Sequence, residues 1–519
     1  MTTIYNNVAA RFERLPAPFA KRCLSALICL TLSACAVGPD YQRPDVSVQS
    51  SWQSPTDQAD EAQLAVWWQQ FADPRLSQLL QLGRDNSPTL QSAAVRIAQA
   101  RAQLGISQGA EWPVVQLSFS RSYSKPDLAN QLQGKTGGGT TQQLSLQASW
   151  EPDLWGAARR EVEGNEASWL STVAAYQAAM VALEANIATT YFNLRTLEQR
   201  LQVAQDNLKQ QAENLRIANA RFRAGASSEQ DLRQAQVLYE QTGANLPTLR
   251  AALQQAQHAL SVLVGQTPDY YQRQFAAAAP MPSVPTGVPS GIPRDLLQRR
   301  PDVLQAEYAA IAQSARIGQA KAALFPSFSL GGSFGFQSSD SGSNHLDDLF
   351  KWHNPVSSAT AGLLMPIFNH GQLVNQVRVQ DAAFEQAILN YQNQVLGAQQ
   401  EVEDALSAIA GNRESRQRLN AAAEAARRST VLALERYKSG ESDFTTVTTA
   451  YQAQLQVEDG LAQAQGNLLQ SFVAVYRALG GGWDGKLTAS LPDNITKTMR
   501  ARTNWGDALD LPNSQRPAQ

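Results

Sequence analysis

The pentapeptide Arg221-Phe222-Arg223-Ala224-Gly225 recurs 215 positions later as Arg436-Tyr437-Lys438-Ser439-Gly440. The same offset aligns Leu263-Val264-Gly265 with Ala478-Leu479-Gly480. Further upstream, an offset of 213 relates three pairs: Pro88 and Pro301, Gly105 and Gly318, Pro113 and Pro326. Two single-residue insertions are then enough to align 88–265 with 301–480. The chain is therefore interpreted as an internal duplication.

The long segment before each pentapeptide has the periodicity of a coiled coil. From Trp169 to Phe222, apolar or alanine residues recur in 15 steps over 53 residues, a mean spacing near 3.53. This value lies closer to 3.5 than to 3.6, which is typical of a coiled-coil seam. The pattern predicts a helix over 157–223, roughly 100 Å long at 1.5 Å per residue, and a second copy over 372–437.

Near the start of each repeat the apolar period changes to two, which predicts a pair of strands. The strands are expected at about 114–123, 143–151, 327–337 and 357–365. Each has about ten residues, the length of a tilted strand that crosses a bilayer. The alternative is a soluble sheet that lies half-buried on the helices.

Four strands from one chain cannot form a membrane-spanning structure alone. Lipid tolerates closed barrels only, and the smallest barrels have about eight strands. If the strands are transmembrane, several copies of the chain must therefore contribute strands to one barrel. The sequence alone does not fix that number at three.

The composition excludes several function classes. Charged residues make up 17% of the chain and the net charge is −2, which argues against binding to nucleic acid by bulk attraction. The four histidines show no ligand-like spacing, and no phosphate-binding loop, HExxH or GxSxG motif occurs. We therefore expect no enzyme activity, no metal and no cofactor other than a covalent lipid.

The N-terminal segment, 1–34, has the features of an export signal. Arginines and a lysine precede the apolar stretch Cys23–Leu32, which is too short to span a membrane as a helix. The junction Leu32-Ser33-Ala34-Cys35 resembles a bacterial lipobox. The resemblance implies that Cys35 becomes the mature N-terminus and carries a diacylglycerol and an N-acyl chain. Ala36, rather than aspartate, follows it, which implies the outer membrane; the alternative is an ordinary signal peptide.

Motifs along nearly the whole mature chain resemble the TolC-like outer-membrane factor family, specifically the lipoprotein branch that serves RND-type drug efflux pumps. The motifs are Val37-Gly38-Pro39-Asp40-Tyr41, Trp67-Trp68 with Phe71, Asp73 and Pro74, Val288-Pro289-Ser290 with Leu297, Arg299-Arg300-Pro301-Asp302-Val303 with Ala306-Glu307, Gly318-Gln319-Ala320-Lys321 with Phe325-Pro326, and Leu479-Gly480-Gly481-Gly482-Trp483.

This resemblance implies an α+β fold built from a duplicated helix-strand-strand-long helix-helix unit. A homotrimer would form a long periplasmic α-helical coiled-coil barrel and a 12-stranded transmembrane barrel, with four strands from each chain. The implied function is a passive exit duct for drugs or other small toxic molecules in the outer membrane of a Gram-negative bacterium. The implied partners are a periplasmic adaptor (membrane fusion protein), an inner-membrane RND transporter and outer-membrane lipid, but no nucleic acid.

Two alternatives stay open. One is a duct of the same fold for type I protein secretion, and the other is a non-channel coiled-coil periplasmic lipoprotein. The predicted organisation is a signal peptide at 1–34, an N-terminal equatorial segment at 35–87, the first repeat at 88–266, a proline-rich linker at 267–300, the second repeat at 301–483 and a polar C-terminal tail at 484–519.

The family also implies a gate at the two helix-hairpin tips. A family tyrosine three residues before the tip glycine matches Tyr437. The family commonly places a carboxylate nine residues after that glycine, often a basic residue at twelve and, in some relatives, an acidic residue at six. These positions hold Thr449, Gln452 and Thr446, so the usual charged latch is missing. Near the tips, carboxylates are either helix-start residues favoured by the macrodipole or an acidic ring that prefers cations. The remaining candidate gate residues are Gly225, Glu229, Asp231, Gly440, Glu441 and Asp443.

Overall fold

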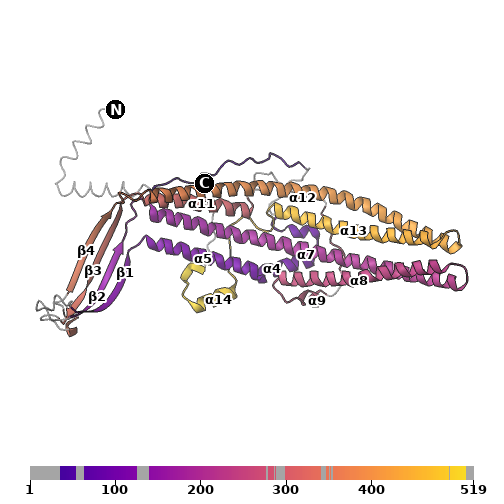
Figure 1. Cartoon of the computed structure of the whole chain (residues 1–519), viewed down its shortest axis with the longest axis horizontal. Coiled ribbons are helices and arrows are strands. Elements are labelled where there is room, and N and C mark those ends of the chain that lie inside the picture. Colours follow the sequence, from indigo (N-terminus) through magenta and orange to yellow (C-terminus); the bar gives the residue numbers. More distant parts are fainter. Residues whose placement is uncertain are drawn as a thin grey trace, which may run out of the picture. The chain divides into compact units, whose positions relative to one another are not determined.

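A computed structural model of the chain describes residues 36–53, 64–125, 139–275, 279–285, 287, 299–340, 346–349, 351, 355–489 and 491–509 (Figure 1). Long helices dominate it, with a small antiparallel sheet. The principal elements are α4 (Pro74–Asn86), α5 (Pro88–Ala110), β1 (Val114–Ser124), β2 (Gly139–Trp150), α7 (Ala157–Arg223), α8 (Glu229–Leu263), α11 (Pro301–Ala322), β3 (Ser327–Ser339), β4 (Pro355–Leu364), α12 (Gln372–Ser439), α13 (Phe444–Ala478) and α14 (Asp493–Arg502). Short helical turns are η1 (Trp67–Phe71), α9 (Tyr270–Gln274), η2 (Leu346–Asp348) and η3 (Gly506–Leu509).

The order helix, strand, strand, long helix, shorter helix occurs twice, as the repeat predicts. The compact units of the structure, however, cut across the two repeats. Unit 1 comprises 1–44, 100–169 and 308–389, and unit 2 comprises 45–99, 170–307 and 390–519. Each unit therefore contains equivalent parts of both repeats, because the duplicated segments are long hairpins that pack side by side rather than separate globules.

The long helices match their predicted bounds closely. α7 has 67 residues at the predicted positions, and α12 has 68 and extends two residues past the predicted end. Within the described ranges, no helix is both long enough and apolar enough to cross a membrane.

Other elements differ from the sequence-based expectation. β2 begins at Gly139, four residues before the expected start, because its polar first residues pair with the end of β1. The polar C-terminal tail contains a helix, α14, whose Met499 is buried with Ala98 and Leu509. The N-terminal segment contains α4, which begins at Pro74 with Asp73 as its N-cap.

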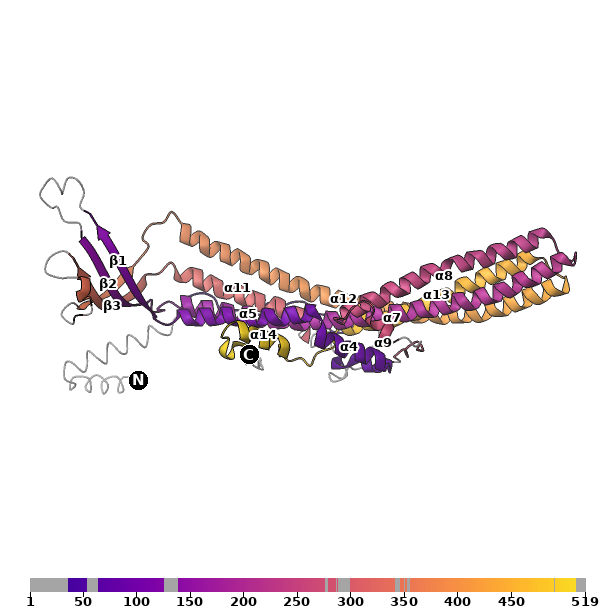
Figure 2. The same ribbon diagram turned by 90° about the horizontal axis from the view of Figure 1, so that it is seen from below.

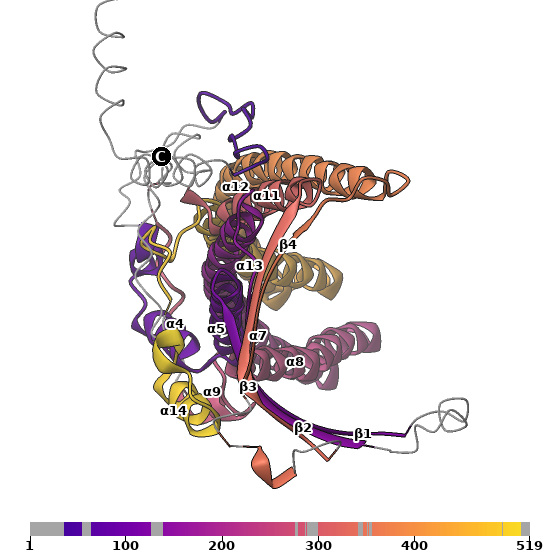
Figure 3. The same ribbon diagram turned by 90° about the vertical axis from the view of Figure 1, so that its left-hand side faces the viewer.

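The sheet belongs to unit 1 and has the order β1-β2-β3-β4, with every neighbouring pair antiparallel. Figure 3 shows the four strands side by side in one curved layer. Within this sheet β1 and β4 each have one neighbouring strand, so each leaves a row of backbone donors and acceptors at an edge.

The two faces of the sheet differ in chemistry. The register places Leu117 opposite Leu146, and Leu146 opposite Phe334, so the three side chains form one apolar row across three strands. Their exposed fractions are 70%, 48% and 48%. The opposite face carries polar rows, such as Ser333 opposite Ser358, whose hydroxyl oxygens lie 2.8 Å apart. An isolated chain in water would therefore expose a continuous apolar surface.

Unit 2 contains the main hydrophobic core. It forms where η1 packs against α7 and α13, around fully buried aromatic rings. Trp67 stacks on Tyr476 with ring centroids 5.2 Å apart, and Phe71 contacts Phe192 with ring centroids 4.8 Å apart. These contacts hold the N-terminal segment against both repeats.

A buried ion pair lies at the edge of this core. Arg84 at the end of α4 pairs with Glu184 of α7, and it also donates to the carbonyl of Gly482 at 2.9 Å. Glu184 is fully buried, and burial raises the pKa of its carboxyl to about 7, against a smaller lowering by Arg84. Gly482 has φ +103°, and a Cβ there would overlap the Glu184 carboxylate. The pair thus fixes three distant segments to one another.

Candidate gate at the helix-hairpin tips

Two hairpin tips, α7–α8 and α12–α13, lie side by side at one end of unit 2 (Figure 2). The two turns have the same hydrogen bonds. Gly225 and Gly440 have φ of 71° and 83°, a left-handed conformation that glycine adopts readily. The following amides, Ala226 N and Glu441 N, each donate at 2.8 Å to the carbonyl five residues earlier. Both turns are therefore the same helix C-cap.

The second helix of each hairpin also begins at equivalent positions. Ser228 is the N-cap of α8, and its hydroxyl accepts from Asp231 N at 3.2 Å. Asp443 is the N-cap of α13, and its carboxylate accepts from Thr446 N at 3.1 Å. The offset between these two caps is the same as the offset between the two glycines.

Tyr437 is the central side chain of the tips. It is 1% exposed and lies in a cluster to which all four helices contribute. Its ring meets Phe444 edge-on with centroids 5.1 Å apart. On its other side the Arg221 guanidinium lies 4.7 Å from the ring centroid. Burial raises the pKa of the Tyr437 hydroxyl above its ordinary value.

The tip carboxylates make local contacts. Glu229 pairs with Arg233 at 3.1 Å, one helical turn away. Asp231 accepts from the Ser228 hydroxyl at 3.1 Å, and Glu441 lies 3.9 Å from Arg436. With Asp443 used as an N-cap, all four sit at or beside a helix start, where the macrodipole favours negative charge.

The three uncharged residues at the positions where the resemblance implied a charged latch lie along α13. Thr446 donates its hydroxyl to Asp443 at 3.0 Å, and Thr449 donates its hydroxyl to the Thr445 carbonyl at 3.0 Å. Gln452 lines a shallow cavity of about 250 Å³ between α8 and α13. Thr446 and Thr449 thus hydrogen-bond within the first turns of α13.

Arg221 was not among the residues predicted for the gate. Its guanidinium donates to the carbonyls of Tyr437 at 2.8 Å and Lys438 at 2.9 Å, both in the last turn of α12. It also donates to Ala226 O in its own turn at 3.3 Å. Arg221 thus caps the helix of the other repeat and joins the two hairpins. The available signal was a basic residue at the same place in both repeats, Arg221 and Arg436.

The predicted lipidation residue, Cys35, lies outside the described residues, but the next two residues are described. Val37 N donates to the Trp155 carbonyl at 3.0 Å. A Cβ on Gly156, which has φ +83°, would lie 2.7 Å from Ala36 Cα. Trp155 stacks on Phe325 with ring centroids 4.8 Å apart, just before β3. Within unit 1, Ala36 is therefore held beside the junction between helices and strands.

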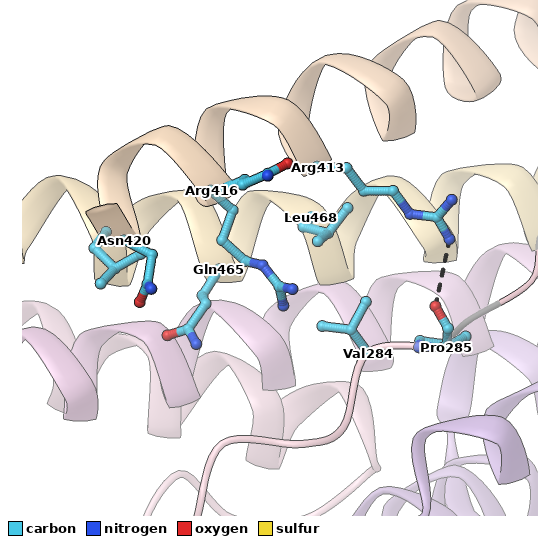
Figure 4. A pocket seen from close by; sticks show the side chains of 9 residues that line it. Val284, Pro285, Arg413, Arg416, Asn420, Gln465 and Leu468 are labelled. Carbon is cyan, nitrogen blue, oxygen red and sulfur yellow. Dashed lines mark hydrogen bonds between the residues drawn. The ribbon is translucent and has the colours of Figure 1, made fainter. Parts of the chain in front are cut away.

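Larger cavities also occur among the described residues. One, of about 640 Å³ in unit 1, is lined by Trp155, Phe325, Phe328 and Leu364 among others. Another, of about 670 Å³ in unit 2, lies between α12, α13 and the linker residues Val284 and Pro285 (Figure 4). Arg413 donates to the Pro285 carbonyl at 3.4 Å, which ties this part of the linker to the second repeat. Over the described ranges, no cluster of three histidine, cysteine or acidic residues is arranged to hold a metal ion.

Comparison with known sequences assigns the chain to a family. The profile described as "Outer membrane efflux protein" matches residues 79–266 and 292–481. Its two matched segments fall on the two repeats. The pyoverdine export outer membrane protein OpmQ of Pseudomonas putida is 33% identical over 88% of this chain and 96% of its own length. The cation efflux system protein CusC of Escherichia coli K12 is 29% identical over 88% of this chain and 98% of its own.

Solved structures give the same result. The outer-membrane channel OprN has a TM-score of 0.80 and 30% identity, and the match covers 87% of this chain and all of OprN. The CmeC outer membrane channel of Campylobacter jejuni has a TM-score of 0.77 and 26% identity over 89% of this chain and 98% of its own. The fold is thus that of a TolC-like channel, with a helical barrel and a β domain. The chain belongs to the outer membrane efflux protein family, whose members are channels rather than enzymes.

Proposed function

We propose that three copies of this chain form one exit duct, and that the duct works with a periplasmic adaptor and an inner-membrane RND transporter. The family function is to be the outer-membrane channel of a tripartite efflux system in a Gram-negative bacterium. The proposal adds the number of copies and the class of the two partners.

The observation that carries the proposal is the two-faced sheet. Its apolar row of Leu117, Leu146 and Phe334 suits lipid, and its polar face suits a water-filled lumen. Unpaired backbone donors and acceptors at a sheet edge are costly in the hydrocarbon core of a bilayer. The edge strands β1 and β4 therefore need to pair with strands from other copies. Three copies would supply twelve strands, within the range of known barrels.

The chain supplies a passage and not the energy for transport. Among the described residues, the polar face of the sheet would line the lumen. The sequence has no nucleotide-binding loop. Energy must therefore come from the transporter. The duct opens when the hairpin tips at Gly225 and Gly440 move apart, and this movement requires the Arg221 contacts to α12 to loosen.

The cargo class is a small molecule. Relatives are named for pyoverdine export, cation efflux and toluene efflux, and these names support small solutes over secreted proteins. The specific compounds depend on the transporter that feeds the duct.

Cys35 anchors the duct through a diacylglycerol and an N-acyl chain. The position of Ala36 supports this part of the proposal, because residue 36 lies against Gly156 near the first residues of β3 and the last of β2. Acyl chains attached to Cys35 would enter the membrane beside the strands. Two or more acyl chains give stable anchoring.

Membrane fractionation and native mass in detergent test the proposal. The protein should remain in the outer-membrane fraction after a high-salt wash, and its solubilised mass should be three times that of one mature chain. A monomer that high salt extracts would contradict both the membrane strands and the trimer.

A further inference from the structure

We propose that Arg436 joins neighbouring subunits at the tips, where it donates to the main-chain carbonyls of Phe222 and Arg223 of the partner subunit. The inference rests on the proposed function, because it requires a ring of copies. It concerns a contact that a single chain cannot make. Its basis is the equivalence of the two hairpins.

The two hairpins are equivalent in hydrogen bonding at both ends. At the tips the glycine turns and the N-caps share one offset between the repeats, 215 positions. At the far ends of α8 and α13, Gln266 N donates to Ser261 O at 2.9 Å, and Gly481 N donates to Tyr476 O at 2.8 Å, again with that offset. The backbones of the two hairpins therefore have the same form, and a contact made by one can be repeated by the other.

Inside the chain, the first repeat contacts the second through Arg221. In a ring, the second repeat must contact the first repeat of the next copy, since head-to-tail interfaces close only when every unit meets its neighbour. With the offset of 215, the residue equivalent to Arg221 is Arg436. The residues equivalent to its acceptors, Tyr437 and Lys438, are Phe222 and Arg223. The residue type is the same at 221 and 436, so the donor is present at both positions.

Exposure supports the same pairing. Arg221 and Tyr437 cover each other inside the chain, and Tyr437 is 1% exposed. Their counterparts are uncovered in a single chain: the Arg436 side chain is 63% exposed and Phe222 is 38% exposed. On α12, Leu432 is 42% exposed, whereas its counterpart Ile217 packs against the tip cluster. An apolar ring and a guanidinium at a tip both gain from a partner that covers them.

Two polar contacts between α7 and α13, both farther from the tips, are not duplicated in the other repeat. Arg200 pairs with Asp459 at 2.7 Å, and Asn207 donates to Glu458 at 2.9 Å. The equivalent positions hold Ser415 with Ala244 and Ala422 with Gly243. Of these three polar contacts, only the tip arginine keeps its chemistry in the second repeat.

Cysteine cross-linking tests this contact. The native cysteines all lie at or before position 35, and Cys35 is expected to be acylated, so introduced thiols have no background. The test variant carries Arg436→Cys with Arg223→Cys. The matched variant carries Arg221→Cys with Lys438→Cys, the equivalent positions within one chain. A series of bis-maleimides is applied to both, and the shortest reagent that joins the matched pair is used for the comparison.

The expected result is a covalent trimer from the test variant in denaturing gels, and an internal cross-link at monomer mass from the matched variant. Either single-cysteine variant should give no covalent trimer. A trimer by native mass in which the test pair stays unlinked would overturn this contact and leave the proposed function intact. A monomer by native mass would overturn the proposed function as well.

A second measurement tests the hydrogen bonds of Arg436 rather than its distance from the partner subunit. Arg436→Ala removes two partly exposed charge-assisted hydrogen bonds from each interface, so the trimer should dissociate at least about tenfold faster in warm detergent. Arg436→Lys keeps the charge and should restore part of the lifetime. Equal lifetimes for wild type and Arg436→Ala would contradict the hydrogen bonds.

Discussion

Arg221 and Tyr437 belong to different repeats, yet the Arg221 guanidinium both donates to the Tyr437 carbonyl at 2.8 Å and lies 4.7 Å from the centre of its ring. One side chain thus caps a helix of the other hairpin and covers its buried aromatic residue. The tips hold together although Thr446, Thr449 and Gln452 are uncharged.

Removal of this side chain should favour the open tip. Arg221→Ala loses two charge-assisted hydrogen bonds and a cation–π contact in a partly exposed site, about 1–2 kcal/mol in all. The open probability in planar bilayers should rise by about tenfold. The control is Arg216→Ala, which removes an exposed arginine of the same helix that pairs with Glu213. If Arg221→Ala and Arg216→Ala have the same open probability, Arg221 does not hold the tip closed.

The tip carboxylates give a prediction about ion selectivity. Asp231→Asn combined with Asp443→Asn removes six charges from a trimer, and asparagine caps a helix about as well as aspartate. Reversal potentials in a salt gradient should therefore shift toward lower cation preference, with little change in thermal stability. Unchanged reversal potentials would reject the acidic ring and leave these residues as helix-start groups only.

The sheet predicts different costs on its two faces. Leu117→Arg places a charge on the apolar face, at a cost of roughly 2–4 kcal/mol near the bilayer midplane. Ser120→Arg, on the same strand but the opposite face, would point into the lumen. We expect Leu117→Arg to reduce the trimer in outer-membrane fractions and Ser120→Arg to leave it near wild type. Equal loss from both would argue for a sheet that is not in lipid.

Glu184 predicts a pH dependence of stability. The folded pKa of about 7 lies above the ordinary value of 4.5, so the folded state binds this proton more tightly than the unfolded state. Its contribution is full below pH 4.5 and is lost as the pH rises through 7, about 3 kcal/mol in total.

The measurement is the midpoint of thermal loss of helical circular dichroism between pH 4 and 8. Glu184→Gln should flatten that part of the curve, whereas Glu240→Gln, an exposed carboxylate on α8, should not. Parallel curves for wild type and Glu184→Gln would show that Glu184 does not titrate in this range.

The lipid anchor has a direct chemical test. Cys35→Ser should abolish incorporation of radiolabelled palmitate, because the thioether and the N-acyl chain both depend on processing at this cysteine. Labelling that persists in Cys35→Ser would place the lipid elsewhere or reduce the N-terminus to an ordinary signal.

The long helices could be predicted from the sequence because their stripe repeats many times. In α7 the apolar residues recur with a mean spacing of 3.53 from Trp169 to Phe222. Deviations at single positions therefore average out, and the pattern predicts where the helix begins and ends. Short elements lack this averaging. α14 is short and mostly polar, and only its tertiary contact at Met499 distinguishes it from a tail.

The candidate site was predictable where it depends on local sequence. Gly225, Gly440 and Asp443 occupy positions that any helix hairpin needs, so the pentapeptide repeat locates them. Arg221 depends on carbonyls that belong to the other repeat, and no spacing rule within one helix reveals that contact. The duplication does reveal it in retrospect, because an arginine is kept at 436.

The central claim is that this chain forms a water-filled duct. Single-channel recording of the purified protein in planar bilayers tests it most directly. We expect discrete conductance steps, short-lived in wild type and prolonged in Arg221→Ala. A purified trimer that gives no conductance steps, either as wild type or as Arg221→Ala, would contradict it.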